Sequence, residues 1–197
     1  MREIVLATRN RHKIVELSSL FESLPLSLKS LADFPPFPEE PEEGMSFEEN
    51  AAKKAASAAL VLSLPCLADD SGLEVDALNG RPGILSARYA KTSPERISRL
   101  LEEMKNVPPE KRAARFVSAM ALALPDGKVI TKTGYCYGII ADTPRGIHGF
   151  GYDPVFILPE LGKTMAELSL QEKNRISHRS EAARLMIPVI REIMKKN

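Results

Sequence analysis

The first 24 residues constrain the fold most, because a buried strand, a polar loop and a helix follow one another there directly. Residues 3–7 (EIVLA) form a short apolar run, which is typical of a strand covered on both faces. Residues 8–13 (TRNRHK) are polar, and apolar residues then recur at helical spacing over 14–24. The start of the chain therefore predicts a strand, a loop and a helix.

The rest of the chain continues this alternation. Proline and glutamate dominate 33–44, which predicts an exposed loop, and a capping box at 46–49 opens a helix to about residue 64. Further helices are predicted at 93–104 and 180–196, and Pro188 should kink the latter or break its hydrogen-bond ladder. Strands are predicted at 65–68, 73–78, 115–124, 128–140 and 155–158. The pattern predicts one α/β domain over 1–197, with a mixed sheet flanked by helices.

Overall composition excludes several classes of protein. The formal net charge of +1 gives no support to binding of nucleic acid or an anionic membrane. No apolar run approaches the roughly 20 residues of a membrane helix, and the N-terminus lacks the apolar stretch of a signal peptide. Cys66 and Cys136 lie in apolar surroundings and read as buried, reduced thiols. We therefore expect a cytoplasmic protein.

Residues 8–13 are the first of four polar clusters that could form a site. A strand followed by a helix aims the N–H groups and the positive dipole end of the helix at one point. Beside them, a hydroxyl (Thr8), an amide (Asn10) and a lysine (Lys13) suit a polyphosphate, although no Walker motif occurs in the chain. The alternative is a solvated helix start with capping residues.

The second cluster is acidic and follows the apolar run at 65–68. Asp69 and Asp70 can hold Mg²⁺ through oxygen ligands and activate a water at the carboxyl end of a strand. The alternative is an acidic turn, because Asp, Ser and Gly are common in turns.

The third and fourth clusters could recognise a nucleobase. In the glycine-rich loop at 146–154, Phe150 could stack on a base while Asp153 accepts its ring N–H. The basic groups of 173–179 could contact an exocyclic oxygen or a phosphate. The alternatives are a phenylalanine tucked into the core and a basic loop before a helix cap. His178 has no second His or Cys at metal-ligand spacing, so zinc is not expected.

Together these segments resemble the inosine/xanthosine triphosphate pyrophosphatase family, which removes non-standard purine nucleotides. The matching segments follow the family order over nearly the whole chain: LATRNRHK (6–13), SFEEN (46–50), LADDSGLEVD (67–76), PGILSARY (82–89), FGYDP (150–154) and SHR (177–179). The resemblance implies an elongated mixed sheet between two lobes, a nucleoside triphosphate in the central cleft, and a homodimer. Arg9 departs from the pattern, since many relatives carry glycine there.

The resemblance also implies roles for individual residues. Asp70 would be the general base and a Mg²⁺ ligand, with Glu40 or Glu42 as a further ligand, and Lys13 would assist by neutralising the triphosphate. Substrate contacts are expected from Thr8, Arg9, Asn10, Arg11, His12, Lys13, Ser71, Phe150, Gly151, Tyr152, Asp153, Lys173, His178 and Arg179.

The expected reaction is Mg²⁺-dependent hydrolysis of ITP, dITP or XTP to a monophosphate and pyrophosphate. Three alternatives stay open at this point: a pyrophosphatase for other modified nucleotides, a sensor that binds without hydrolysis, and a nucleic-acid-binding module. The near-zero net charge and the absence of Trp weigh against the last.

Overall fold

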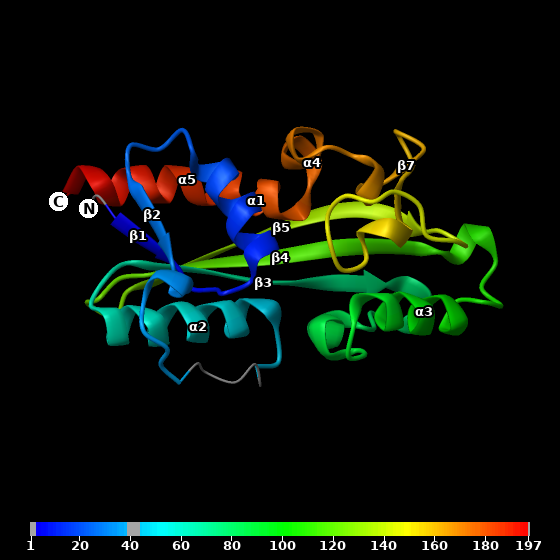
Figure 1. Cartoon of the computed structure of the whole chain (residues 1–197), viewed down its shortest axis with the longest axis horizontal. Helices are drawn as coiled ribbons and strands as arrows, with labels where there is room; N and C mark the ends of the chain where they lie inside the picture. The colour runs from blue at the N-terminus through cyan, green and yellow to red at the C-terminus, as the bar shows by residue number, and fades with distance from the viewer. Residues whose placement is uncertain (1–2, 39–43, 197) are drawn as a thin grey trace. The chain divides into compact units, whose positions relative to one another are not determined.

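The computed structural model describes residues 3–38 and 44–196, and its strands form one sheet in the order β2-β1-β3-β4-β5-β6-β7 (Figure 1). β1 runs parallel to β2 and β3, whereas β6 runs antiparallel to β5 and β7. The predicted α/β class with a mixed sheet is therefore confirmed. The strands are β1 (Glu3–Leu6), β2 (Ser27–Ser30), β3 (Cys66–Val75), β4 (Ala113–Ala123), β5 (Val129–Ile140), β6 (Phe156–Leu158) and β7 (Lys163–Thr164).

Five α-helices lie within the described ranges, and local sequence explains where most of them begin. They are α1 (Arg11–Phe21), α2 (Phe47–Leu62), α3 (Ser93–Glu103), α4 (Leu170–Ile176) and α5 (His178–Lys196). Asn10, Ser46 and Thr92 cap α1, α2 and α3 through side-chain oxygens that accept backbone N–H groups. Across 3–38 and 44–196, none of the helices has the length and apolar character needed to cross a membrane.

The chain divides into two compact units. Unit 1 draws on 1–70, 118–134 and 179–197. Figure 1 shows α1 and α5 on one face of its strands and α2 on the other. Side chains along β1 alternate between the two faces of the sheet. Ile4 and Leu6 pack with α1 and α5, while the buried Val5 points to the opposite face.

Unit 2 comprises 71–117 and 135–178 and has a core of its own. Leu73 and Val75 of β3 pack there with Leu100 of α3 and Phe156 of β6. Phe116 of β4 extends this core, with its ring centroid 4.3 Å from that of Phe156. Each unit therefore has the hydrophobic core expected of a separately packed body. The prediction of a single domain over 1–197 stays a prediction.

The structure corrects two assignments around β3 and α4. Residues 66–75 form one uninterrupted strand, so the acidic pair lies within a strand and not in a turn between two strands. Lys173 and Arg175 lie on the short helix α4 and not in a loop, and β2 and β7 were not predicted. The final helix, α5, begins at His178 and continues through Pro188.

Other local expectations agree with the structure. The strands predicted at 115–124 and 128–140 correspond to β4 and β5, which are neighbours joined by a tight turn in which Leu124 donates its N–H to the carbonyl of Lys128. Both cysteines are buried free thiols, and burial raises the pKa of Cys66 to about 12. At α2, Ser46 accepts from the Glu49 N–H, but Glu49 reaches the Met45 N–H, so the predicted capping box is only half formed.

Candidate functional site

Asn10 is the N-cap residue of α1. The Asn10 Oδ1 accepts the N–H groups of His12 at 3.0 Å and Lys13 at 3.4 Å, and Thr8 Oγ1 accepts the Asn10 N–H at 3.2 Å. These helix N–H groups therefore already have a protein acceptor. An anion at this position would rely on the side chains of the loop, or would have to displace Asn10.

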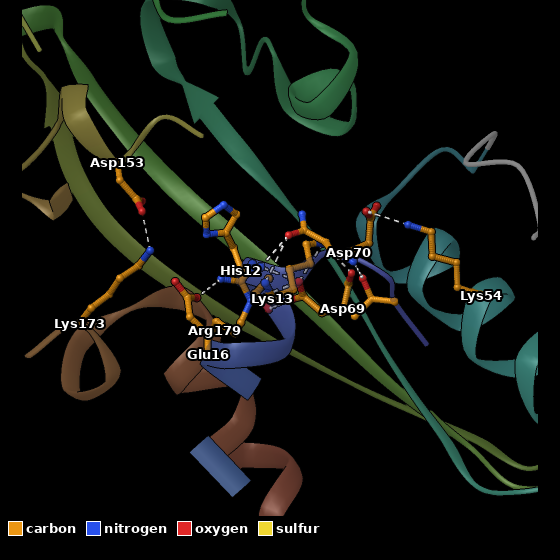
Figure 2. A network of polar contacts seen from close by, with 12 residues as sticks. His12, Lys13, Glu16, Lys54, Asp69, Asp70, Asp153, Lys173 and Arg179 are labelled. Atoms are coloured by element: carbon orange, nitrogen blue, oxygen red, sulfur yellow. Dashed lines mark hydrogen bonds and ion pairs between the residues drawn. The ribbon is translucent and has the colours of Figure 1, made fainter. Parts of the chain in front are cut away.

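Asp69 lies at the centre of a buried ion network in unit 1. Arg179, at the start of α5, donates from Nε at 3.2 Å and Nη2 at 3.1 Å to Asp69 Oδ2. Arg179 Nη1 donates to Glu16 of α1, and Ser118 of β4 donates to Asp69 Oδ1 at 2.5 Å (Figure 2). The network thus joins β3, β4, α1 and α5 through charges removed from water.

Lys13 joins this network from the exposed side. Its Nζ donates to the backbone carbonyl of Asp69 at 2.9 Å and lies 3.0 Å from Asp69 Oδ2. The Lys13 side chain remains 15% exposed, whereas that of Asp69 is completely enclosed. Its ammonium group is therefore held at a fixed point, on a side chain that is not completely buried.

The charges around Asp69 fix its ionisation state. Burial by itself would raise the pKa of this carboxyl, but Arg179, Lys13 and the Ser118 hydroxyl together hold it well below its usual range. For Arg179, burial works against the charged form, and Asp69 and Glu16 outweigh it to raise the pKa. Asp69 is consequently a structural anion at neutral pH.

Asp70 points to the other face of β3, because successive side chains alternate along a strand. Asn50 of α2 donates from Nδ2 to Asp70 Oδ2 at 3.1 Å, and Lys54 Nζ lies 3.7 Å from Asp70 Oδ1. The orientation of the Asn50 amide is set by Gly44, whose N–H donates to Asn50 Oδ1 at 2.8 Å. Asp70 is therefore held as a hydrogen-bond acceptor, with 9% of its side chain open to solvent.

Unit 2 holds a second polar cluster around Asp153. Lys173 Nζ of α4 donates to Asp153 Oδ2 at 2.5 Å, and the backbone N–H of Phe150 donates to the same oxygen at 2.8 Å. The Lys173 ammonium also lies 5.1 Å from the centroid of the Phe150 ring. Lys173 and Asp153 are only 3% and 2% exposed, so they form a buried ion pair beside an aromatic face.

Two other predicted base contacts in unit 2 are packed into its core. The His178 ring stacks on Phe116 with centroids 4.8 Å apart, and the Tyr152 hydroxyl donates to the carbonyl of Ser86 at 3.1 Å. Burial raises the pKa of Tyr152, which keeps its phenol neutral. Both rings are therefore largely enclosed within unit 2.

In each unit the structure thus brings some of the predicted residues together. Unit 1 brings Lys13 and Arg179 together at Asp69, with the loop residues Thr8 to His12 at the helix start and Asp70 on the opposite face of β3. Unit 2 brings together Phe150, Asp153 and Lys173, while Ser71 lies on β3 and Gly151 in the loop. That all of them serve one nucleotide stays a prediction.

The predicted metal ligands can be placed only in part. Glu40 and Glu42 lie outside the described residues. Within 3–38 and 44–196, no group of three or more His, Cys, Asp or Glu side chains is placed to hold a metal ion. Asp70 still fits Mg²⁺, because this ion is commonly bound by one or two carboxylates together with waters and substrate phosphates.

Several residues of these networks were not predicted from the sequence, among them Asn50, Lys54, Glu16 and Ser118. Asn50 and Lys54 lie in an alanine-rich helix where polar residues usually face solvent. Their spacing of four places them on one face of α2, which is the signal that could have found them. Glu16 looks like an exposed charge on α1, and nothing local reveals its partner 163 positions away.

The fold and the site define the class: an α/β protein with an open mixed sheet, an anchored lysine, and a carboxylate held as a hydrogen-bond acceptor. The sequence matches the model of the Ham1 family over residues 4–189. The chain belongs to the Ham1 family.

Comparisons with individual relatives agree with this membership. The chain is 50% identical over 189 residues to a dITP/XTP pyrophosphatase of Geobacter sulfurreducens, covering 94% of this chain and 95% of the relative. It is 52% identical over 185 residues to one of Geobacillus kaustophilus, covering 92% and 91%. A HAM1 protein structure from Coxiella burnetii superimposes with a TM-score of 0.88 at 42% identity, covering 98% of this chain and 100% of the other.

Proposed function

We propose that this protein hydrolyses non-standard purine nucleoside triphosphates, such as dITP, ITP and XTP, to the monophosphate and pyrophosphate. Relatives at about half identity over most of their length carry the name dITP/XTP pyrophosphatase. The observation in the structure that supports hydrolysis most directly is the contrast between two neighbouring carboxylates. The Asp69 side chain is completely enclosed and paired with Arg179 and Lys13, while that of Asp70 is 9% exposed and accepts a hydrogen bond from Asn50.

The first requirement of the reaction is neutralisation of the triphosphate. Lys13 suits this role because Asp69 fixes the position of its ammonium, while the side chain is still 15% exposed. Lys54, on the Asp70 side of β3, is a second candidate, with a side chain 20% exposed. Fixed cations stabilise the charge that develops on a leaving pyrophosphate without having to reorganise during the reaction.

In the proposed step a water molecule attacks the α-phosphorus. A bond forms between the water oxygen and the α-phosphorus, the bond from that phosphorus to the bridging oxygen breaks, and pyrophosphate leaves. The water proton passes to the Asp70 carboxylate. Asn50 holds this carboxylate as an acceptor by donating to its Oδ2, which is the state a general base requires.

We propose Mg²⁺ as the cofactor, held by Asp70 together with Glu40 or Glu42. The ion would supply charge neutralisation at the phosphate oxygens and polarisation of the attacking water. Asp70 Oδ2 accepts the hydrogen bond from Asn50, and Asp70 Oδ1 lies 3.7 Å from Lys54 Nζ.

We propose that the cluster of Phe150, Asp153 and Lys173 reads the base. Phe150 offers an aromatic face, and the Lys173 ammonium beside it can donate to a 6-oxo group. The 6-amino group of adenine is itself a hydrogen-bond donor, so neither it nor the Lys173 ammonium would find an acceptor in the other. A mismatch of this kind between buried polar groups gives selectivity of about 10⁴. GTP also carries a 6-oxo group, so its rejection needs contacts near the 2-position.

The remaining parts of the proposal concern partners. We expect a homodimer, as the family resemblance implies, a small-molecule substrate and no bound nucleic acid. The near-neutral net charge supports the last point.

The position of attack is tested by hydrolysing ITP with Mg²⁺ in water enriched in ¹⁸O. We expect one ¹⁸O atom in the monophosphate and unlabelled pyrophosphate, because water attacks the α-phosphorus. Label in the pyrophosphate would place the attack on the β-phosphorus. Label in orthophosphate would place it on the γ-phosphorus, and either result would overturn the proposed reaction.

A further inference from the structure

Gly149 lies against the carboxylate that anchors the base-reading cluster of unit 2. Its backbone has a φ of +73°, in the left-handed region that favours glycine. A Cβ atom built on Gly149 would lie 2.0 Å from Asp153 Oδ2 and 2.9 Å from Asp153 Cγ. Both separations are far below a van der Waals contact, so any side chain at this position would force the carboxylate or the loop to move.

The oxygen that Gly149 accommodates is the one on which the cluster depends. Asp153 Oδ2 accepts both the Lys173 ammonium at 2.5 Å and the Phe150 N–H at 2.8 Å. A displaced carboxylate would lose both bonds together. The buried Lys173 ammonium would lose its ion pair with Asp153. The backbone N–H of Phe150 would lose its hydrogen bond to the same carboxylate.

We infer that Gly149 is a positioning residue for base selectivity, because the absence of a side chain lets Asp153 hold Lys173 and Phe150 in place. This inference rests on the proposed function and deepens it. Gly149 acts through Asp153 and contributes no atom of its own to recognition of the base. Its effect is therefore expected in the choice between 6-oxo and 6-amino purines and not merely in stability.

The test compares Gly149→Ala with a matched control, Gly162→Ala. Gly162 lies in the same unit with a φ of +63°, but a Cβ there would meet nothing within 4 Å. Both variants share the strain of a side chain on left-handed backbone, and only Gly149→Ala adds the clash. We expect the ratio of kcat/KM for ITP to that for ATP to fall at least about tenfold in Gly149→Ala and to stay at the wild-type value in Gly162→Ala.

A double-mutant cycle with Asp153→Ala tests whether Gly149 acts through the carboxylate. In the Asp153→Ala background the clashing oxygen is gone, so Gly149→Ala should change the ITP-to-ATP ratio no further. If Gly149→Ala alone does not fold, the double variant should regain folding, measured as a higher Tm. A double variant that fails to fold while Asp153→Ala folds would overturn the inference.

The outcomes separate this inference from the proposed function. If the wild-type protein does not prefer ITP to ATP, the proposed function fails before any variant is considered, and the inference fails with it. If the wild type has the preference and Gly149→Ala keeps it as Gly162→Ala does, only the inference is wrong. Equal losses from Gly149→Ala in the wild-type and Asp153→Ala backgrounds would also contradict it.

Discussion

Asp69 and Asp70 are adjacent in sequence yet face different surroundings, because a strand sends successive side chains to opposite faces. Asp69 meets Arg179 and Lys13, while Asp70 meets Asn50 and Lys54 of α2. The same residue type therefore serves as a fixed structural anion on one face and as a candidate base on the other. This division depends on β3 being continuous through both residues.

Replacing Asp70 with Asn is expected to lower kcat by about 10³-fold or more, because an amide cannot accept the water proton. Nucleotide affinity should change little, since Lys13 is anchored by Asp69 and not by Asp70. Steady-state kinetics and equilibrium binding of ITP measure the two effects. Asp142→Asn is the matched control, because the Asp142 side chain is 83% exposed and lies outside both clusters. Near-normal kcat in Asp70→Asn would show that another group is the base.

The residues of the site could be predicted from the sequence, but their partners could not. The polar loop at 8–13 and the acidic pair stand out because each follows a buried strand. Asp, Ser and Gly favour turns, so local propensity at 69–72 predicted a turn. The structure overrides it because Arg179, 110 positions away, neutralises Asp69 inside the strand. Interactions over such separations leave no local trace in one sequence.

At the scale of elements, α2 is tied to β3 through Asn50. This residue is 1% exposed, accepts the Gly44 N–H and donates to Asp70. It thus connects the end of the loop before α2 with the candidate base. A buried amide with both ends bonded specifies one arrangement of the two elements, since an inverted amide would break both bonds.

Asn50→Ala is expected to lower kcat about tenfold to a hundredfold while changing KM for ITP much less, because a hydrogen bond to a charged group contributes about 1.5–3 kcal/mol. The control is Lys53→Gln, at an exposed position three residues further along α2. It should leave kcat within about twofold of the wild type, because the exposed i,i+4 pair of Lys53 with Glu49 contributes little. Steady-state kinetics of both variants, with Tm as the check on folding, decide the matter. Equal kcat values for the two variants would show that the hydrogen bond from Asn50 to Asp70 does not contribute to catalysis.

Elements with clear periodicity were predicted within a few residues, and those without it were missed. α3 shows a capping box, a proline at the first turn and a regular apolar face. β2 (SLKS) is only four residues long and three of them are polar, so nothing in its sequence marks a strand. α4 does carry a capping box, Ser169 with Glu172, and this signal could have identified the helix.

At the scale of the whole molecule, each unit is stabilised by a hydrophobic core of its own. Leu17 of α1 is fully buried in unit 1, and Leu100 of α3 is fully buried in unit 2. The stability of each unit should therefore depend chiefly on its apolar contacts.

Leu17→Ala and Leu100→Ala are each expected to lower the free energy of unfolding by about 2–5 kcal/mol, because each leaves a cavity in a packed core. Leu60→Ala is the matched control, since Leu60 lies on α2 but is 78% exposed, and its change should stay within about 0.5 kcal/mol. Urea denaturation measures all three. A cost for Leu60→Ala equal to that of the core variants would contradict the assignment of the cores.

The central claim is that this protein releases pyrophosphate from non-standard purine nucleoside triphosphates. The most direct test incubates the purified protein with Mg²⁺ and, separately, ITP, XTP, GTP, ATP and dTTP, and then quantifies pyrophosphate and orthophosphate. We predict rapid release of pyrophosphate from ITP and XTP and slow release from the other three. Orthophosphate as the direct product, equal rates for all five, or tight binding without any product would contradict the account, and the last result would indicate a nucleotide sensor.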